Sequence, residues 1–231
     1  MRYIYLFIIL SCFNCNNERI LHLPEIKNAD VTEVLDVSPA YIFYDKTQPD
    51  STLLNRKNLI ITTNWLVNVD KRLTLRQAIP HIKFLQDKKR NSELHKNKDA
   101  KNYFTCNDTS ISNLGFLEFT DINYEFTDSG DKTINLKTLI PKQLTDDGVA
   151  SDNLLILPIQ INNNNKTKIE NEIREMVKFT TTVTKNERIT EFLIRLYFDE
   201  NLSFKDYISV KSKLSKLKLD KIIIDTNEFI Y

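Results

Sequence analysis

Two segments of the chain repeat one order of hydrophobic and polar positions. Residues 65–77 and residues 194–206 each show an apolar run, an Asp turn, a hydroxyl residue and the start of an amphipathic helix. This order predicts two βαβ-like units, each with its helix against one face of a sheet. An internal duplication would produce such a pair, and so would a generic pattern that occurs twice. With a constant offset of 129, the matched pairs are Asp70 with Asp199, Leu73 with Leu202, Thr74 with Ser203, Arg76 with Lys205, Ile79 with Ile208 and Leu85 with Leu214.

The hydroxyl residues Thr74 and Ser203 predict where the two helices begin. A side-chain oxygen at this position accepts a hydrogen bond from an otherwise free amide of the first turn. Gln77 completes a capping box with Thr74, and Asp206 is a less typical partner for Ser203. Pro80 lies inside the first helix and predicts a kink or a later start there. Apolar residues recur at helical spacing, at Leu75, Ile79, Ile82 and Leu85 in one helix and at Tyr207, Val210, Leu214 and Leu217 in the other.

The remaining elements follow from local apolar runs and turn residues. A turn at residues 127–131 separates two apolar segments, 116–126 and 134–140. Further strands are expected over residues 31–37, 40–44, 102–106 and 222–225, and a further helix over residues 166–177. The predicted fold class is α+β, with mixed sheets and helices packed on one face.

The N-terminus has the layout of a secretory signal peptide. Met1 and Arg2 precede an apolar run at residues 3–10, and polar residues follow closely. A membrane-spanning helix needs about 20 apolar residues, so this run is too short to be one. We therefore expect it to direct export.

The residues Ile9, Leu10, Ser11 and Cys12 resemble the bacterial lipobox. That resemblance implies diacylglycerol on Cys12, cleavage before it, and attachment to a membrane through the new N-terminus. The implied location is the bacterial cell envelope, with the folded part facing the periplasm. The alternative is an ordinary signal peptide in which Cys12 is incidental, and Cys15 fits the lipobox less well.

These features divide the chain into four parts. Residues 1–11 are the predicted signal peptide, and residues 12–38 a lipid-anchored tether that gradually becomes structured. Residues 39–150 are the first α+β unit, and residues 151–231 the second.

Composition sets broad limits on function. The formal charge is +1, from 32 basic and 31 acidic residues, so the chain has no electrostatic footprint for binding nucleic acid. With 41% hydrophobic residues, including 13 Phe and 9 Tyr, it can form a packed core. After lipidation of Cys12, Cys15 and Cys106 retain thiols, and a disulfide between them or a buried free thiol at Cys106 are both open.

The most polar candidate site directly follows the predicted strand 102–106. Its residues are Cys106, Asn107, Asp108, Thr109 and Ser110, and the polar stretch continues to Asn113. Loops in this position often carry function, although a capped structural loop is the simpler interpretation.

Other chemistry has weaker support. His22, His81 and His95 lack metal-ligand spacing, and three glycines form no phosphate-binding loop, so no metal or cofactor is expected. Asp70 and Asp199 are interpreted as turn residues rather than paired catalytic carboxylates.

The last third of the chain resembles the periplasmic domain of the ExbD/TolR family of energy-transduction accessory proteins. The similar segments are residues 157–162, residues 194–199, the helix from Ser203 and the strand at residues 221–225. That family carries an N-terminal transmembrane helix with an acidic residue, which the first 17 residues here do not provide. The resemblance therefore implies a domain that docks other proteins or cell wall, as a homodimer, without ion-channel function.

These observations predict a non-enzymatic envelope lipoprotein. Its expected role is a protein- or cell-wall-binding scaffold, linked to an energy-transduction system of the ExbD/TolR type. The alternatives are an envelope hydrolase that uses the Cys106–Asn113 loop and a ligand-binding lipoprotein exposed at the cell surface.

Overall fold

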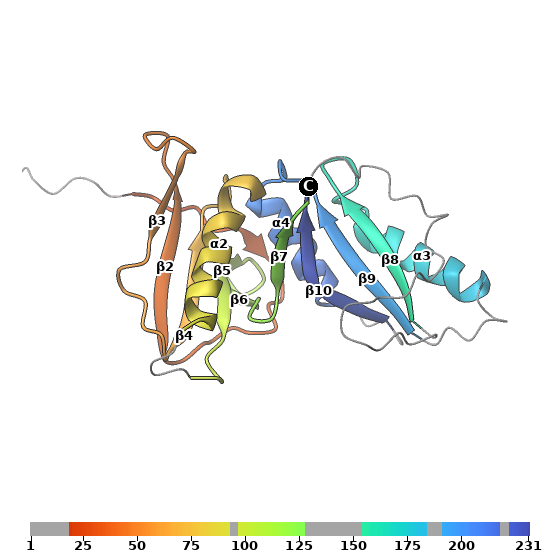
Figure 1. Ribbon diagram of the computed structural model, residues 1–231, viewed down its shortest axis with the longest axis horizontal. Helices are drawn as coiled ribbons and strands as arrows, with labels where there is room; N and C mark the ends of the chain where they lie inside the picture. Colours follow the sequence, from red (N-terminus) through yellow and green to blue (C-terminus); the bar gives the residue numbers. More distant parts are fainter. Residues whose placement is uncertain (1–18, 93–96, 128–153, 184–190, 218–221) are drawn as a thin grey trace, which may run out of the picture.

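The computed structural model describes residues 19–92, 97–127, 154–183, 191–217 and 222–231 (Figure 1). The strands are β1 (Glu25–Ile26), β2 (Val37–Tyr44), β3 (Thr52–Asn55), β4 (Asn64–Val69), β5 (Asn102–Asp108), β6 (Asn113–Glu118), β7 (Asn123–Phe126), β8 (Leu154–Ile161), β9 (Glu191–Phe198) and β10 (Ile222–Ile230). The helices within these ranges are α2 (Leu75–Arg90), α3 (Ile169–Val183) and α4 (Phe204–Leu214). The predicted α+β fold class, with mixed sheets and packed helices, is confirmed.

The strands form two sheets. The first has the order β1-β5-β4-β2-β3, with β6 also paired to β5, and the second has the order β7-β10-β9-β8. In the first sheet β2, β4 and β5 are parallel neighbours, as β8, β9 and β10 are in the second. Both units therefore show the strand order that a duplication requires. Descent from a single ancestral unit stays a prediction.

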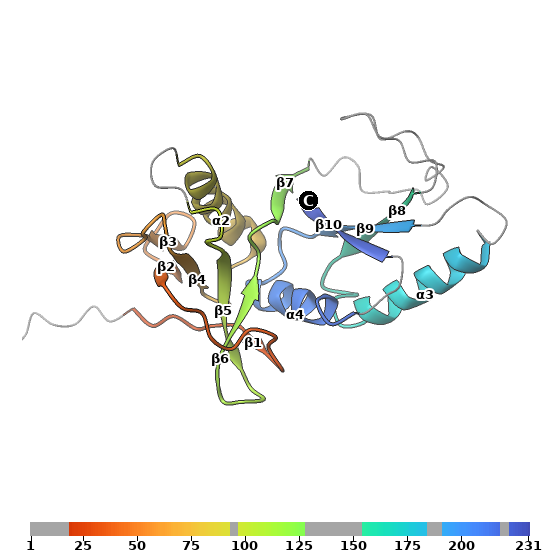
Figure 2. The same ribbon diagram turned by 90° about the horizontal axis from the view of Figure 1, so that it is seen from below.

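The two units differ in their first crossover. The antiparallel strand β3 pairs with β2 in the first unit, whereas α3 connects β8 to β9 in the second. The second crossover is helical in both, through α2 and through α4. Viewed from below, α2 and the α3–α4 pair lie on opposite sides of the molecule (Figure 2).

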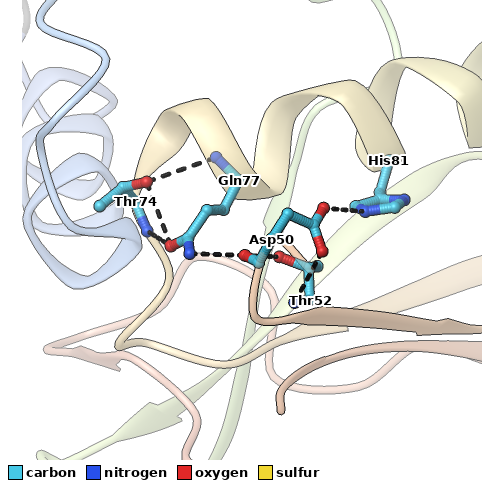
Figure 3. Close-up of polar contacts among 5 residues, drawn as sticks. All are labelled: Asp50, Thr52, Thr74, Gln77 and His81. Carbon is cyan, nitrogen blue, oxygen red and sulfur yellow. Dashed lines mark hydrogen bonds and ion pairs between the residues drawn. The ribbon is translucent and has the colours of Figure 1, made fainter. Parts of the chain in front are cut away.

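The helix starts were predicted correctly. Thr74 caps α2 in a full capping box with Gln77 (Figure 3), and the side chain of Ser203 accepts from the amide of Asp206. The alternative of a later start at Pro80 is wrong, because α2 begins at Leu75. The helix expected over residues 166–177 is α3, which begins and ends later.

Several predicted strands have different limits. The edge strand expected over residues 31–37 is wrong, because Val31 makes only an isolated bridge and β2 starts at Val37. The segment 116–126 is divided between β6 and β7, which belong to different sheets. The strands expected at 102–106 and 222–225 are present and extend further. The segment 134–140 and the turn before it lie outside the described residues, apart from Thr127.

The predicted boundaries between tether and units also differ from the sheets. Strand β1 belongs to the first sheet although it falls in the expected tether. Strand β7 pairs with β10 although it falls in the expected first unit. Each of these two strands pairs with a segment that is distant in sequence, and local sequence patterns do not report such pairing.

A single hydrophobic core joins both units. Phe104 of β5 stacks on Phe119, with ring centroids 3.8 Å apart, and meets the edge of Phe204 of α4 at 5.2 Å. Phe198 of β9 packs edge-on against Tyr207 at 5.1 Å. The helices in the described ranges are all too short or too polar to cross a membrane.

Candidate binding cleft

A cleft of 690 Å³ lies at the junction of the two units, between β1 and α4. Strand β1 and helix α4 lie side by side there (Figure 2). Both units contribute to it, and sites of this kind favour such junctions. Its lining residues are Glu25, Ile26, Lys27, Thr109, Glu170, Lys205, Asp206, Ser209, Ser212, Lys213 and Lys216.

The polar face of the amphipathic helix α4 forms one wall of this cleft. Phe204, Tyr207 and Ile208 turn into the core, where they are fully buried. Lys205, Ser209 and Lys213 recur every four residues, so they share one face of the helix, and all three line the cleft. A cation–hydroxyl–cation series therefore follows the helix along the cleft.

The carboxylates of the cleft are already paired with cations. Glu25 lies 2.9 Å from the ammonium of Lys71, Glu170 pairs with Arg174 at 3.1 Å, and Asp206 pairs with Lys166 at 2.7 Å. These cations are not lining residues of the cleft. The negative charge of the lining is therefore largely neutralised from outside it.

The four lysines of the cleft are not paired with carboxylates in this way. Within the described ranges, none of them has a carboxylate within 4 Å; they are Lys27, Lys205, Lys213 and Lys216. Lys205 is still close enough to help Lys71 lower the pKa of Glu25. Lys216 donates from its ammonium to the carbonyl of Lys27 and so bridges the two walls. The cleft thus offers cationic groups to an anionic ligand.

Backbone pairing holds β1 in place as the other wall. The amide of Lys71 donates to the carbonyl of His22, and the amide of Thr109 donates to that of Ile26, at 2.8 and 3.0 Å. The amide of Asn107 likewise donates to Pro24 at 2.8 Å. Because β1 is the first strand in the described part of the chain, the N-terminal part of the first sheet forms this wall of the cleft.

Asp108 fastens the residues that follow β1. Its carboxylate accepts from the amides of Asn28 and Ala29, at 3.1 and 2.6 Å, and from the amide and hydroxyl of Ser110. These hydrogen bonds, that of Ala29 first, lower the pKa of Asp108 to about 2. Asp108 is therefore an internal clasp between the β5–β6 loop and the N-terminal segment.

The other residues of the predicted interaction loop divide into buried and exposed. Cys106 is a fully buried free thiol, and burial, with the charge of Asp108, raises its pKa to about 12. A thiol in this state is a poor nucleophile. Asn107, Thr109 and Ser110 are exposed. Cys12 and Cys15 lie outside the described residues.

The exposed loop borders a second, smaller hollow. This hollow has a volume of 520 Å³ and lies over the β5–β6 turn. Thr109 lines both it and the cleft, so the predicted loop forms the rim between them. The residues lining the hollow are Asn107, Asp108, Thr109, Ser112, Asn113 and Leu114.

The remaining candidates have structural partners. His81 lies 3.8 Å from the carboxylate of Asp50, whose carbonyl accepts from Gln77, so both contacts hold the β2–β3 hairpin against α2 (Figure 3). Asp70 is fully buried and bonded to Arg72 at 2.7 and 2.8 Å. Asp199 accepts from Asn201 in the equivalent turn. His, Cys, Asp and Glu form no group of three suited to a metal within the described ranges.

Lys89 and Glu228 are among the buried polar groups that the sequence did not predict. The ammonium of Lys89 donates to the carbonyls of Thr63 and Lys101 and to Asn102, at 3.0 to 3.1 Å. Glu228 is fully buried and accepts from Tyr207 at 2.7 Å and from Lys211. Neither lines the cleft. The lysines of α4 were also missed, because charge on the polar face of a helix ordinarily indicates solvent contact.

Comparison with known proteins gave no relative. No protein-family model, curated protein or solved structure matches the chain.

Proposed function

We propose that this protein is a cell-envelope lipoprotein whose folded part is a non-enzymatic binding module. The lipid on Cys12 anchors it, and the cleft between β1 and α4 engages another envelope component. The observation that carries the proposal is the cleft itself, where four lysines lack an anionic partner within the described ranges.

The loop geometry supports a binding role over the hydrolase alternative. Hydrolysis through the Cys106–Asn113 loop would use the thiol of Cys106 or the carboxylate of Asp108. The first is buried with a raised pKa, and the second is occupied by backbone amides. A docking role is also what the resemblance to the ExbD/TolR periplasmic domain implies.

Anchoring and binding are tested separately. Replacing Cys12→Ala should abolish incorporation of labelled palmitate and release the protein from washed membranes. Continued lipidation of that variant would contradict anchoring through Cys12. Protease treatment of intact cells then distinguishes a periplasmic module, which is protected, from the surface-exposed alternative.

Binding is tested by placing a photo-crosslinking residue at Thr109, on the rim of the cleft, in the full-length chain. We expect adducts with an envelope component that are absent when the same residue replaces Lys46, which is exposed on the β2–β3 turn. A turnover activity that disappears in Cys106→Ser while the fold is kept would instead establish the hydrolase. Asp108→Ala is unsuitable for that purpose, because it also removes the clasp.

A further inference from the structure

We propose that the cleft between β1 and α4 binds an extended acidic segment of a partner protein. This deepens the proposed function and rests on it, because it names what the binding module takes.

The spacing of the lysines suits an extended peptide. Lys205 and Lys213 are eight residues apart on α4, so their backbone positions are about 12 Å apart at 1.5 Å per residue. An extended chain advances about 3.3 Å per residue, and every second side chain points the same way. Two acidic residues four positions apart would therefore reach both ammonium groups from one side of the peptide.

The groups between the lysines suit a peptide backbone. Ser209 lies midway between Lys205 and Lys213 on one wall. On the opposite wall, the hydroxyl of Thr109 donates to the carbonyl of Ile26 at 3.3 Å and keeps its capacity to accept. Hydroxyl groups both donate and accept hydrogen bonds, as the amides and carbonyls of a peptide require. Ile26 adds an apolar group to the lining. Cations at the ends and neutral groups in the middle would therefore match acidic residues separated by uncharged ones.

The shape of the cleft argues against the other anionic ligands of an envelope. A single phosphate or lipid headgroup is compact and would reach only one end of the lysine series. A membrane surface is broad and would be met by a convex patch, whereas this site is hollow, with a volume of 690 Å³.

The test measures peptide binding to the full-length chain in detergent by fluorescence anisotropy. One labelled peptide carries Glu at two positions four residues apart in a Gly/Ser background, and its control carries Gln instead. We expect the Glu peptide to bind at least about tenfold more tightly, with an affinity that falls as salt is raised. Equal binding of the two peptides would overturn the proposal.

Charge-removing variants then locate the site. The double variant Lys205→Gln with Lys213→Gln should weaken binding of the Glu peptide by about tenfold or more. Each substitution removes an ion pair between a lysine and a glutamate of the peptide, and such pairs contribute to affinity in a partly enclosed site. Lys27→Gln tests the opposite wall. The matched control is Lys46→Gln with Lys57→Gln, two exposed lysines on the far side of the first unit. Undiminished binding by the α4 variant, with an unchanged unfolding midpoint, would place the peptide elsewhere and overturn the proposal.

Two competitors identify the source of the acidic groups. Vesicles containing phosphatidylglycerol and purified peptidoglycan sacculi are offered to the native chain and to the α4 variant. Retention of either one through Lys205 and Lys213, without binding of the Glu peptide, would replace the protein segment with lipid or cell wall. If the peptide fails while Thr109 still gives its crosslinks, the peptide proposal falls and the binding function stands. If both fail, the function falls as well.

Discussion

Thr74 and Ser203, the N-cap residues of α2 and α4, lie opposite each other in an antiparallel bridge. The amide of Leu75 donates to the carbonyl of Leu202 at 2.9 Å, and the amide of Phe204 donates to that of Leu73 at 2.6 Å. Adding 129 to the numbers of Leu75 and Leu73 gives Phe204 and Leu202, so each hydrogen bond is the counterpart of the other in the second unit. The contact therefore has the reciprocity of a two-fold dimer interface within one chain.

A second pair of hydrogen bonds obeys the same exchange. The amide of Arg76 donates to the backbone carbonyl of Glu200 at 2.9 Å, and the amide of Lys205 donates to the backbone carbonyl of Lys71 at 3.2 Å. Duplication of a self-associating unit would give this arrangement. A homodimer of the whole chain stays a separate prediction.

Removing the two caps should destabilise the protein in a coupled way. Thr74→Ala and Ser203→Ala are each expected to cost about 1 kcal/mol of unfolding free energy, because each leaves a first-turn amide without its acceptor. Because the two caps lie opposite each other in the bridge, the loss of stability in the double variant should differ from the sum of the two single losses by about 0.5 kcal/mol or more. Urea unfolding of the four proteins measures this. Thr32→Ala, at an exposed position, is the control, and strict additivity would contradict the coupling.

Asp108→Asn should loosen the N-terminal segment. The variant is expected to unfold at lower urea concentration and to exchange the amide hydrogens of Asn28 and Ala29 faster, because the acceptor loses its charge. Asp121→Asn, an exposed acid, is the control. Unchanged exchange at both amides would show that the clasp does not hold the segment.

The same clasp should give a signature at acid pH. The pKa of Asp108 is lowered from 3.8 to about 2 in the folded chain, so its stabilisation is present above about pH 4 and is lost as pH falls toward 2. Stability of the native protein should therefore fall more steeply over this interval than that of Asp108→Asn. Parallel curves would contradict the assignment.

Lys89 should make stability depend on alkaline pH. Burial lowers its pKa from 10.5 to about 8, so between these values the unfolded chain holds a proton that the folded chain has lost. Unfolding free energy should consequently rise with pH from about 8 to 10.5. Lys89→Met should lack this rise and Lys88→Met should keep it, in urea unfolding at several pH values. A rise of equal size in all three proteins would assign it to other groups.

Tyr207→Phe should destabilise the contact between α4 and β10. The phenol donates to the buried carboxylate of Glu228 and lies 3.1 Å from the hydroxyl of Tyr124. Its loss should cost about 1 to 3 kcal/mol, because buried polar groups are left without a partner. Thermal or urea unfolding measures the change. Tyr197→Phe, at a half-buried position, is the control, and an equal small effect of both would show that the hydroxyl contributes little.

The sequence by itself determined the local elements of both units. Hydrogen-bonding side chains indicated that the two helices begin after the caps Thr74 and Ser203. The spacing of apolar residues indicated the strands that flank each helix and the α+β class. These features depend on residues close together in the chain, so a local pattern reports them. The envelope location proposed from Cys12 also comes from the sequence alone, and the lipidation of Cys12 stays a prediction.

Only the tertiary structure decided which distant segments meet. It placed β1 beside β5, β7 beside β10, and β1 against α4, and so created the cleft. It also showed that Asp108, a predicted interaction residue, accepts hydrogen bonds from amides some 80 residues earlier in the chain and so holds the N-terminal segment. No local pattern carries such information, because pairing between strands and burial of charge are decided by the whole packed chain.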